Sequence, residues 1–418
     1  MKTFLKQLVL CLFCFTCVTQ SLPVSRDAGH TEYAILFDAG SSGTRLRIYQ
    51  FLASGPSLEP SDVRELSASP DEANPGISDL ADDPSQVEDY MTPLLESAKK
   101  TIPEDKQAST PIFLFATAGM RLIPQDQADA ILNEVRKLFN DKEKCPFMFQ
   151  DDDDARIITG KTEGIYAWVT VNFLVGAYRS KGLTYGSLDL GGASHQNAWR
   201  FNSSHPDVAV VDFAGKKYQI FARSYLGFGQ DQARERYLRV IAEEQNCVEN
   251  CVVKSPCHNK GFKETLKFNG QERVFKGTAQ VKRCRQIIRE VFFCRVQNVQ
   301  KCPFYDQPKL KGRFYGFSSF YYILTGIGAV CSDCEKNKVT PRKVNLYSKS
   351  FCKKDYDDLE KNPYAKNYCF GGNFIYELLN EGYRLGPYKK IRVTNSLNGF
   401  KLGWTLGAVL KNTDIMKE

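Results

Sequence analysis

The chain has 418 residues, of which 42% are hydrophobic and 25% are charged, as is typical of a globular protein. The formal net charge of +8 is small for this length, and no stretch of basic residues with interleaved aromatic residues occurs. We therefore expect no nucleic-acid partner. The chain is too long for one compact core, so we expect two domains.

Residues 1–21 have the pattern of a secretory signal peptide. Lys2 and Lys6 give a basic start, and residues 8–18 form an apolar core of the length that such signals have. This core is too short to predict a membrane span, and no later apolar run reaches spanning length. We expect a secreted protein, or one in the lumen of the secretory pathway, with no membrane anchor after the signal is cleaved.

Residues 35–45 have the sequence Ile-Leu-Phe-Asp-Ala-Gly-Ser-Ser-Gly-Thr-Arg, and β-rich sequence follows. This pattern predicts a strand, a tight turn in which the glycines can take positive φ, and a second strand. Such a turn can point backbone N–H groups and the hydroxyls of Ser41 and Ser42 at an anion. Asp38 ends the first strand, where its carboxylate can hold a cation that the same anion carries.

The next part of the chain predicts alternating strands and helices. Residues 53–86 are rich in Ser, Pro, Asp and Gly and predict a surface connection. The four adjacent carboxylates at 151–154 are more typical of a solvated turn than of a metal site. The spacing of apolar residues predicts helices at 87–100 and 125–139, a buried strand at 111–119, and a mostly apolar helix at 163–175 between the domains.

Residues 186–196 repeat the pattern of the first turn, with the sequence Gly-Ser-Leu-Asp-Leu-Gly-Gly-Ala-Ser-His-Gln. One such turn could be an ordinary hairpin. Two of them, each following an apolar strand, are typical of the actin-like phosphotransferases, in which paired loops hold one phosphate chain between two domains. The aspartate of this second turn is Asp189.

The remaining chain predicts strands at 208–213 and 218–222 and a helix at 230–244, and then becomes rich in cysteine from 247 to 369. In an exported protein this density implies disulfides. A zinc site at Cys331 and Cys334 would need a second pair of ligands, and none is evident. Asn202 begins the one unblocked N-glycosylation sequon.

Five segments together resemble the ectonucleoside triphosphate diphosphohydrolases, or apyrases, and occur in that family's order. They are DAGSSGTR at 38–45, ATAGMRL at 116–122, ITGKTEGIYAWVTVNFLVG at 158–176, DLGGASHQ at 189–196 and GWTLG at 403–407. The family's FSxFYY and YCFxG segments also occur, at 317–322 and 368–372. One departure lies inside a motif, because His195 stands where the family usually carries Thr.

The resemblance implies an α/β fold of two actin-like (ribonuclease H-like) domains, with mixed sheets flanked by helices and the active site in the interdomain cleft. Domain I would comprise residues 28–159 and 395–418, and domain II residues 160–394. The implied activity is removal of terminal phosphates from nucleoside tri- and/or diphosphates by a monomer that needs Ca²⁺ or Mg²⁺. Water would attack the phosphate directly, without a phosphoenzyme.

The resemblance also assigns roles to single residues. Glu163 would be the general base, Asp38 and Asp189 would hold the cation through water, and Tyr321 and Tyr368 would stack on the nucleobase. Residues expected around the attacking water and the terminal phosphate are Thr117, Ser194 and Gln196. Backbone and hydroxyl donors for the phosphates are expected from Ser41, Ser42, Gly43, Gly191, Gly192, Ala193 and Ser194. Disulfides are implied at Cys247–Cys257, Cys251–Cys284, Cys294–Cys302 and Cys352–Cys369, with Cys331–Cys334 as a further candidate pair and Cys145 left over.

Several of these residues have a plainer interpretation. Glu163 could merely cap a helix, because a carboxylate is favourable in a first helical turn. Trp404 lies near the active site in the family but could be a core residue, and Arg121 could be structural. His195 could meet a phosphate or face away from it.

Two other functions stay open at this point. The Gly43-Thr44-Arg45 step resembles the family's soluble branch, in which a secretory-pathway enzyme prefers UDP or GDP. A protein on the same scaffold could also bind nucleotides or glycans without catalysis.

Overall fold

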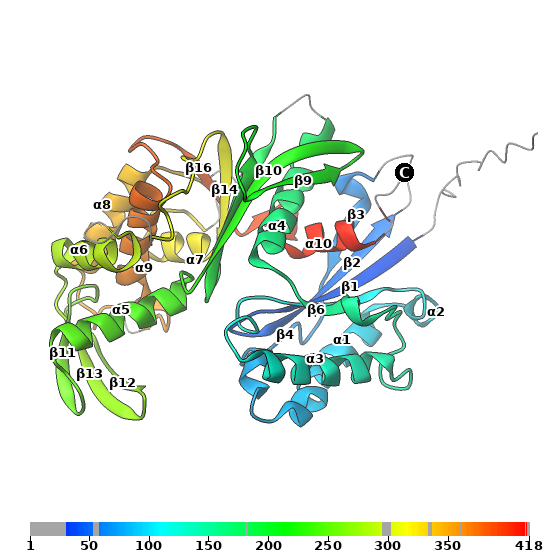
Figure 1. The fold of residues 1–418 in the computed structure, drawn as a ribbon, viewed down its shortest axis with the longest axis horizontal. Coiled ribbons are helices and arrows are strands. Elements are labelled where there is room, and N and C mark those ends of the chain that lie inside the picture. Colours follow the sequence, from blue (N-terminus) through cyan, green and yellow to red (C-terminus); the bar gives the residue numbers. More distant parts are fainter. Residues whose placement is uncertain are drawn as a thin grey trace, which may run out of the picture.

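The computed structural model describes residues 31–52, 58–179, 183–294, 302–332, 337–359, 361–413 and 415. Two mixed sheets lie on either side of a pair of helices, and further helices cover the outer faces of both sheets (Figure 1). The predicted signal peptide at 1–21 lies outside the described residues. Within the described part of the chain, none of the helices combines the length and the apolar composition that crossing a bilayer requires.

The first sheet has the strand order β3-β2-β1-β5-β6, and β4 pairs with β2. Its strands are β1 (Thr31–Ala39), β2 (Thr44–Leu52), β3 (Val63–Leu66), β4 (Glu72–Ala73), β5 (Ile112–Ala116) and β6 (Ala155–Ile157). The hairpin of β1 and β2 is antiparallel, while β1, β5 and β6 run parallel. The carboxyl ends of β1 and β5 therefore meet at one edge of the sheet.

Each face of this sheet packs on different helices, because side chains alternate along a strand. On β1, Ile35 and Phe37 pack with α1 (Val87–Thr101) and α3 (Gln125–Asn140). Ala34 and Leu36 face the opposite side, toward α4 (Gly160–Leu174) and α10 (Thr405–Asn412). The short helix α2 (Glu104–Gln107) follows α1.

The second sheet has the order β15-β16-β14-β7-β8-β10-β9. Its strands are β7 (Tyr185–Leu190), β8 (Ser194–Arg200), β9 (Val208–Phe213), β10 (Lys216–Leu226), β14 (Arg313–Ser318), β15 (Lys338–Val339) and β16 (Ile391–Val393). β7 and β14 run parallel, so both end at the same edge. A two-stranded ribbon of β17 (Ser396–Leu397) and β18 (Phe400–Lys401) leads into α10.

α4 lies between the two sheets and is apolar on nearly all sides, as expected for a helix that contacts protein all round. It packs closely on α10. A Cβ atom added to Gly407 would lie 2.0 Å from the carbonyl oxygen of Tyr166, so this crossing requires glycine. The Gly407 N–H donates to the Thr170 hydroxyl at 2.8 Å.

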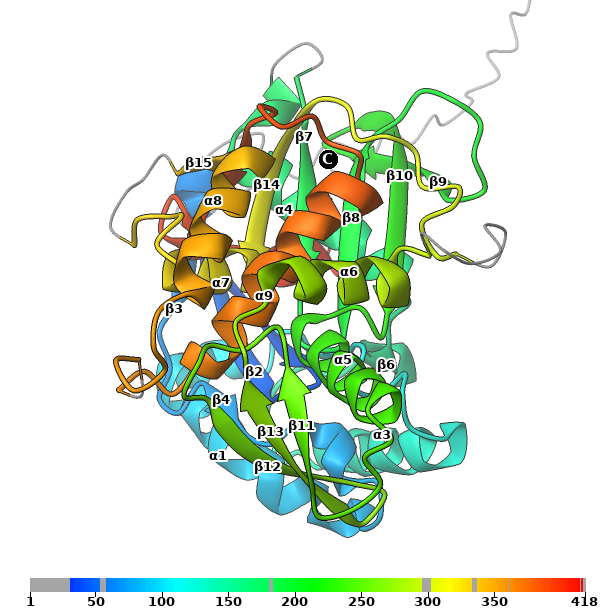
Figure 2. The same cartoon turned by 90° about the vertical axis from the view of Figure 1, so that its left-hand side faces the viewer.

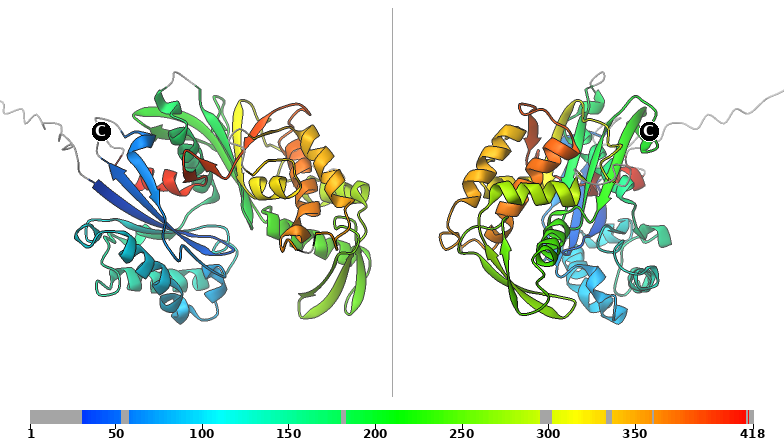
Figure 3. Two further views of the ribbon diagram at one scale, coloured as in Figure 1. Left: turned by 180° about the vertical axis from the view of Figure 1, so that it is seen from behind. Right: turned by 60° about the vertical axis from the view of Figure 1, so that its left-hand side comes forward.

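Helices on the outer face of the second sheet form the largest core cluster with it. They are α5 (Gln230–Glu244), α6 (Val281–Phe292), α7 (Ser319–Gly326), α8 (Pro341–Cys352) and α9 (Ala365–Glu377), which continues into a π-helical turn (Leu378–Gly382). Figure 2 shows α6, α8 and α9 in front of this sheet. The small sheet of β11 (Cys251–Ser255), β12 (Lys263–Phe268) and β13 (Gln271–Gly277) extends away from it at one end (Figure 3).

The α/β class with mixed sheets and flanking helices is confirmed, and the helices expected at 87–100, 125–139 and 230–244 form with bounds within about two residues. The segment 53–86 differs from the expected connection, because β3 and β4 within it pair with β2. The division into domains 28–159 plus 395–418 and 160–394 stays a prediction. The strands of the first sheet all lie within residues 28–159, and those of the second sheet all lie within residues 160–394.

The disulfides correct part of the expected pattern. Cys352–Cys369 forms as expected, but the structure has Cys247–Cys251 and Cys257–Cys284 instead of Cys247–Cys257 and Cys251–Cys284. Asn246 and Asn250 both take φ of 50°, which reverses the chain and brings the two nearest cysteines together. Cys257, beyond β11, then meets α6.

Three further expectations concern the remaining cysteines. Cys294 and Cys302 are free thiols rather than the expected disulfide, although they are hydrogen-bonding neighbours. Cys145 is free and buried, as expected for the cysteine left over. The candidate pair Cys331–Cys334 includes Cys334, which lies outside the described residues.

Candidate active site

The two Asp-containing turns face each other across one cavity. The first connects β1 and β2, and its Gly40 N–H donates to the Gly43 carbonyl at 3.0 Å. The second connects β7 and β8. A Cβ atom added to Gly192 would lie 3.0 Å from the Ser41 hydroxyl oxygen, so the two loops approach each other closely at this point.

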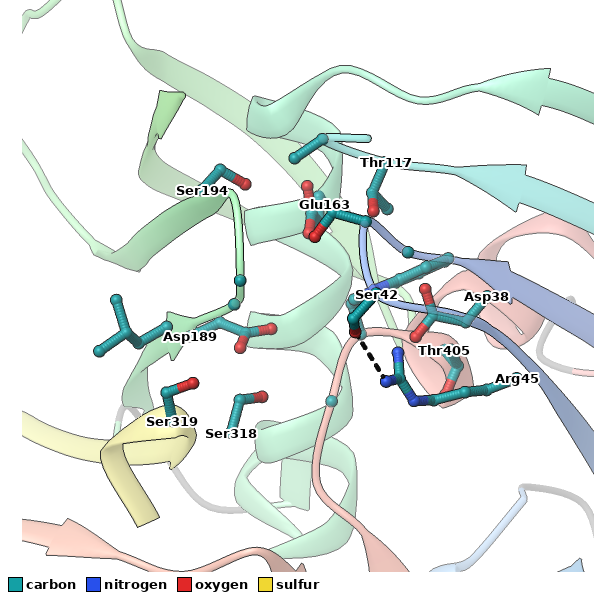
Figure 4. Close-up of a pocket in the computed structure, with 18 of the residues that line it drawn as sticks. Asp38, Ser42, Arg45, Thr117, Glu163, Asp189, Ser194, Ser318, Ser319 and Thr405 are labelled. Atoms are coloured by element: carbon teal, nitrogen blue, oxygen red, sulfur yellow. Dashed lines mark hydrogen bonds between the residues drawn. The ribbon is translucent and has the colours of Figure 1, made fainter. Parts of the chain in front are cut away.

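The cavity between these loops has a volume of about 420 Å³. Its lining combines the edges of both sheets with the loop before α10. The lining residues that were expected from the sequence are Asp38, Ser41, Ser42, Thr117, Glu163, Asp189, Gly191, Gly192, Ala193, Ser194 and Trp404. Figure 4 shows Thr117, Glu163 and Ser194 together at one end, with Asp38 and Asp189 on opposite walls.

The first turn of α5 holds the second loop in place. The N–H of Gln230 donates to the Gly191 carbonyl at 2.8 Å, and the N–H of Asp231 donates to the Gly192 carbonyl at 2.9 Å. The approach is so close that a Cβ atom on Gly229 would lie 2.4 Å from the Gly192 carbonyl oxygen. These bonds satisfy helix N–H groups that lack a partner within the helix and fix the orientation of the loop carbonyls.

A buried hydrogen-bond network surrounds Glu163. Its Oε2 accepts from Arg121 Nη2 at 2.7 Å and from Gln196 Nε2 at 3.1 Å. The same Gln196 nitrogen donates to the Ser194 hydroxyl at 2.7 Å. Thr117 follows β5 directly, and its N–H donates to the Ala39 carbonyl at 3.1 Å. The structure thus brings Glu163, Thr117 and Ser194 to one end of the cavity, and Gln196, which does not line it, is hydrogen-bonded to two of them.

Three carboxylates of the cavity, those of Glu163, Asp189 and Asp38, have raised pKa values. Burial raises the pKa of Glu163 to about 8, against the opposing effect of the Arg121 charge, and the negative charge of Asp189 adds to the rise. Burial also raises the pKa of Asp189 to about 6, although the nearby Ser318 side chain opposes the rise. The pKa of Asp38 is raised by desolvation too, with Arg45 and Arg47 opposing.

The donor set fits a divalent cation held through water. The negative charge of Asp38 adds to the raised pKa of Asp189, and that of Glu72 adds to the raised pKa of Asp38, so negative charge gathers on both walls of the cavity. In the described residues, no group of three or more His, Cys, Asp or Glu side chains is close enough to hold a metal ion directly. Two carboxylates with water between them and the ion are the arrangement that Mg²⁺ commonly takes.

The cavity does not include the expected tyrosine pair. Tyr321 donates its hydroxyl to the Ser332 carbonyl at 3.2 Å, and Tyr368 is buried against Gly326 of α7. Tyr322, the next residue of α7, lines the cavity and is 58% exposed. Successive residues of a helix point about 100° apart, so one step along α7 decides which tyrosine faces the cavity.

His195 faces away from the site, because residues of β8 alternate between its two faces. Ser194 and Gln196 point toward Glu163, whereas the His195 ring stacks on Tyr225 with centroids 4.7 Å apart. Its Nδ1 lies 3.2 Å from the Phe228 carbonyl, and burial lowers its pKa to about 4. The ring is therefore a neutral core residue rather than a phosphate contact.

Other expectations depend on the surroundings of single residues. Trp404 lines the cavity and also stacks on Phe115, so it is both a residue of the candidate site and a core residue. Asn202 is exposed in the connection between β8 and β9, and its glycosylation stays a prediction.

Sequence analysis missed some residues that line the cavity: Arg45, Asp231, Ser318, Ser319, Tyr322 and Thr405. Asp231 could have been found from its place in the first turn of the predicted helix at 230–244. Ser318, Ser319 and Tyr322 lie within the FSxFYY segment at 317–322, which is the signal that could have pointed to them.

Comparisons with known proteins agree with this geometry. The sequence matches the GDA1/CD39 (nucleoside phosphatase) family over residues 25–418. It is 29% identical to the ectonucleoside triphosphate diphosphohydrolase 1 of Bos taurus, over 99% of this chain and 89% of that protein. It is 32% identical to the ectonucleoside triphosphate diphosphohydrolase 5 of the same species, over 92% and 88%. A nucleoside-diphosphatase of Caenorhabditis elegans, mig-23, is 26% identical over 93% of this chain and 78% of its own length.

Solved structures share the fold at low identity. A nucleoside triphosphate hydrolase from Neospora caninum superposes with a TM-score of 0.67 at 13% identity, covering 91% of this chain and 92% of its own. A Ppx/GppA protein from Aquifex aeolicus gives a TM-score of 0.53 at 14% identity, covering 91% and 97%. The expected actin-like fold is confirmed by these neighbours.

Proposed function

Since this chain belongs to the GDA1/CD39 (nucleoside phosphatase) family, we propose that it removes terminal phosphates from nucleoside di- and triphosphates by direct attack of water. Membership makes it an apyrase-type hydrolase of nucleoside phosphates. The observation that carries the mechanism is the position of Glu163, a buried carboxylate at the end of a cavity that two Asp-containing loops enclose.

Each part of the cavity has a task in this proposal. The loops at 40–43 and 191–194 provide backbone N–H groups and hydroxyls for the phosphate oxygens, where negative charge increases in the transition state. Asp38 and Asp189 would hold Mg²⁺ or Ca²⁺ through water, and the ion would neutralise phosphate charge. Tyr322 would stack on the nucleobase, which makes the enzyme tolerant of different bases.

Glu163 removes the proton from the attacking water. A general base works best when its pKa lies near the working pH, and the raised pKa of Glu163, about 8, meets that condition. Ser194 and Gln196 keep the Glu163 carboxylate and the water in place, because Gln196 Nε2 donates to both the Glu163 carboxylate and the Ser194 hydroxyl. Thr117 faces the same space from the other sheet (Figure 4).

Secretion is part of the proposal. The predicted signal peptide at 1–21 supports it, and so do three disulfides among the described residues, because disulfides persist in oxidising compartments. The names of the relatives cover both triphosphate and diphosphate hydrolysis, so phosphate release from ATP, ADP, UDP and GDP should be compared. Excess EDTA should abolish release from all four, whereas a silent binding protein would release none even with Mg²⁺ or Ca²⁺.

The decisive experiment is Glu163→Gln. We expect kcat to fall by about 10²–10⁴-fold, the usual range for a general base, with little change in KM because the carboxylate contacts water and not the bound phosphate. Glu377→Gln is a matched control, since Glu377 is another buried carboxylate, paired with Arg289 at 2.8 Å on α6, that does not line the cavity.

Labelled water distinguishes direct attack from a covalent route. In H₂¹⁸O the label should enter the released phosphate, and acid quench should trap no phosphorylated protein. A stoichiometric phosphoprotein, or a Glu163→Gln variant with near-normal kcat, would overturn the proposal.

A further inference from the structure

One edge of the second sheet carries a group of basic side chains that the candidate site does not use. They come from three parts of the chain: the edge strand β15, the start of α8, and the segment that leads into β16 (Figure 2). We call this group the basic edge. Its members are Lys338, Arg342, Lys343, Lys389, Lys390 and Arg392, of which Arg392 is partly exposed and the others are exposed.

On one side of the edge, the cations lie on the sheet itself. Lys338 of β15 is paired with Arg392 of β16, and cross-strand partners share a face of the sheet. The Arg392 guanidinium lies over the Tyr185 ring, 5.0 Å from its centroid, and a further cation, Arg313, lies 5.8 Å from the same centroid. The two positive charges over this ring repel each other, and an anion beside them would relieve that repulsion.

On the other side of the edge, the cations gather around Tyr388, which is 68% exposed. Arg342 Nη1 donates to the Tyr388 hydroxyl at 3.0 Å. Lys343 is the next residue of α8, while Lys389 and Lys390 follow Tyr388 directly. Residues some 45 positions apart in sequence therefore place their charges together.

No carboxylate balances this charge. The chain has no Asp or Glu from residue 336 to 354 or from residue 382 to 413. Among the described residues, none of the six cations forms an ion pair, whereas Arg234, Arg239 and Arg283 on the helices nearby all do. Unpaired charge of one sign that is concentrated in this way attracts a partner of the opposite sign.

We propose that the basic edge binds a linear sulfated polysaccharide. Val339 and Ile391 pack in the same core cluster as α8, so their neighbours Lys338 and Arg392 point to the opposite face of the sheet. The cations of α8 lie on the other side of the edge. A flexible chain can wrap around this edge and contact both sides at once, whereas a flat bilayer can contact only one.

The chemistry of the cations fits sulfate groups. Sulfate presents its oxygens to the planar donors of arginine as phosphate does, and the lysines add further positive charge along the polymer. The proposed secretion would bring the protein into contact with such polymers outside the cell. None of the six cations lines the cavity, so a polymer bound at the basic edge can hold the enzyme without occupying the site.

The test compares two variants of the full-length protein that lose the same charge. The edge variant combines Arg342→Gln, Lys343→Gln, Lys389→Gln and Lys390→Gln. The control variant combines Lys137→Gln, Lys254→Gln, Lys267→Gln and Lys276→Gln, which replace exposed lysines outside the basic edge. Calorimetry would measure the Kd of a heparin dodecasaccharide at several NaCl concentrations between about 0.05 and 0.3 M, because salt screens such contacts.

We expect the edge variant to raise the Kd of the dodecasaccharide by about 100-fold at physiological salt. The slope of log Kd against log NaCl concentration should fall by about 3, since each cation that contacts a linear polyanion contributes about 0.7–0.9. The control variant should keep a Kd within about twofold of wild type. Both variants should hydrolyse ADP at the wild-type rate, because none of the replaced residues lines the cavity.

Four results would overturn the inference. They are equal losses of affinity in the two variants, no binding of the dodecasaccharide by the wild-type protein, unchanged binding after its sulfate groups are removed, and binding of phosphatidylserine vesicles or duplex DNA without binding of heparin. The last result would identify a membrane or a nucleic acid as the partner instead. Since each readout is a Kd measured without nucleotide, none of them bears on the proposed hydrolysis.

Discussion

Arg121 should control the pH dependence of the reaction through Glu163. The two side chains are 2.7 Å apart between Arg121 Nη2 and Glu163 Oε2, and their side chains are only 16% and 9% exposed. The positive charge favours the ionised carboxylate, which is the form that acts as a base. Replacing Arg121 by Gln should therefore raise the pKa of Glu163 above about 8 and move the acidic limb of kcat/KM to higher pH.

The size of the shift follows from the distance. Two unit charges about 4 Å apart interact by about 4 kcal/mol at an effective dielectric constant of about 20, which corresponds to about 3 pKa units. The glutamine amide can still donate a hydrogen bond to the carboxylate, and this retains part of the effect. We therefore expect a shift of about 1–2 units, in line with the usual influence of an adjacent arginine on a carboxyl group.

The assay is kcat/KM for one nucleotide from about pH 5.5 to 10.5, at saturating cation. At pH 7 the variant should be about 10- to 100-fold slower than wild type, because a smaller fraction of Glu163 is ionised. The two profiles should converge at high pH. Arg289→Gln, which breaks the ion pair with Glu377, should leave the acidic limb of the kcat/KM profile at the wild-type pH. If Arg121→Gln lowers kcat/KM equally at every pH, or leaves the acidic limb where it is in the wild type, then Glu163 is not the base that Arg121 keeps ionised.

Two further predictions concern the aromatic residues around the site. Tyr322→Ala should raise KM for ATP by about 5- to 100-fold, the usual effect of losing a stacking contact, and should leave KM for inorganic tripolyphosphate unchanged. Tyr321→Ala should leave the ratio of these two KM values within twofold of the wild-type ratio. Equal effects on both substrates would show that Tyr322 serves folding instead. His195→Phe should change how stability depends on pH. The pKa of His195 is lowered from 6.5 to about 4, so the unfolded wild-type chain takes up a proton where the folded chain does not. Stability linked to this histidine is present above pH 6.5 and is lost as the pH falls to about 4. Relative to wild type, the variant should gain about 3 kcal/mol in the free energy of unfolding over that interval, measured by urea denaturation. A difference that does not vary with pH would mean that the ring titrates normally.

The two loops and their aspartates could be predicted from sequence because each depends on local chemistry. An apolar run, an aspartate and small residues specify a strand and a turn without reference to the rest of the fold. The amphipathic helices at 87–101 and 125–140 are equally local, since their apolar spacing follows the helical period. The composition of α4 indicated burial on all sides before its neighbours were known.

The features that were missed depend on partners distant in sequence or on single dihedral angles. The strands β3 and β4 are short and polar and form only because β2 offers them an edge. The disulfides depend on a chain reversal at two asparagines with positive φ, whereas spacing alone allows many connectivities. The choice between Tyr321 and Tyr322 depends on where α7 begins, and helix ends are hard to place to a single residue.

The hydrogen bonds of Glu163 argue against the interpretation that it merely caps α4. If this residue only capped α4, its side chain would accept from backbone N–H groups of the first turn. The cap is already made by Thr159, whose side chain accepts from the Thr162 N–H at 3.1 Å. Glu163 lies one residue beyond Thr162, and its carboxylate accepts from Arg121 and Gln196 instead. The carboxylate is therefore not needed to cap its own helix, and it is buried where ionisation is costly. Its place at the end of the cavity, within a network that also holds Ser194, is what a base for an attacking water requires.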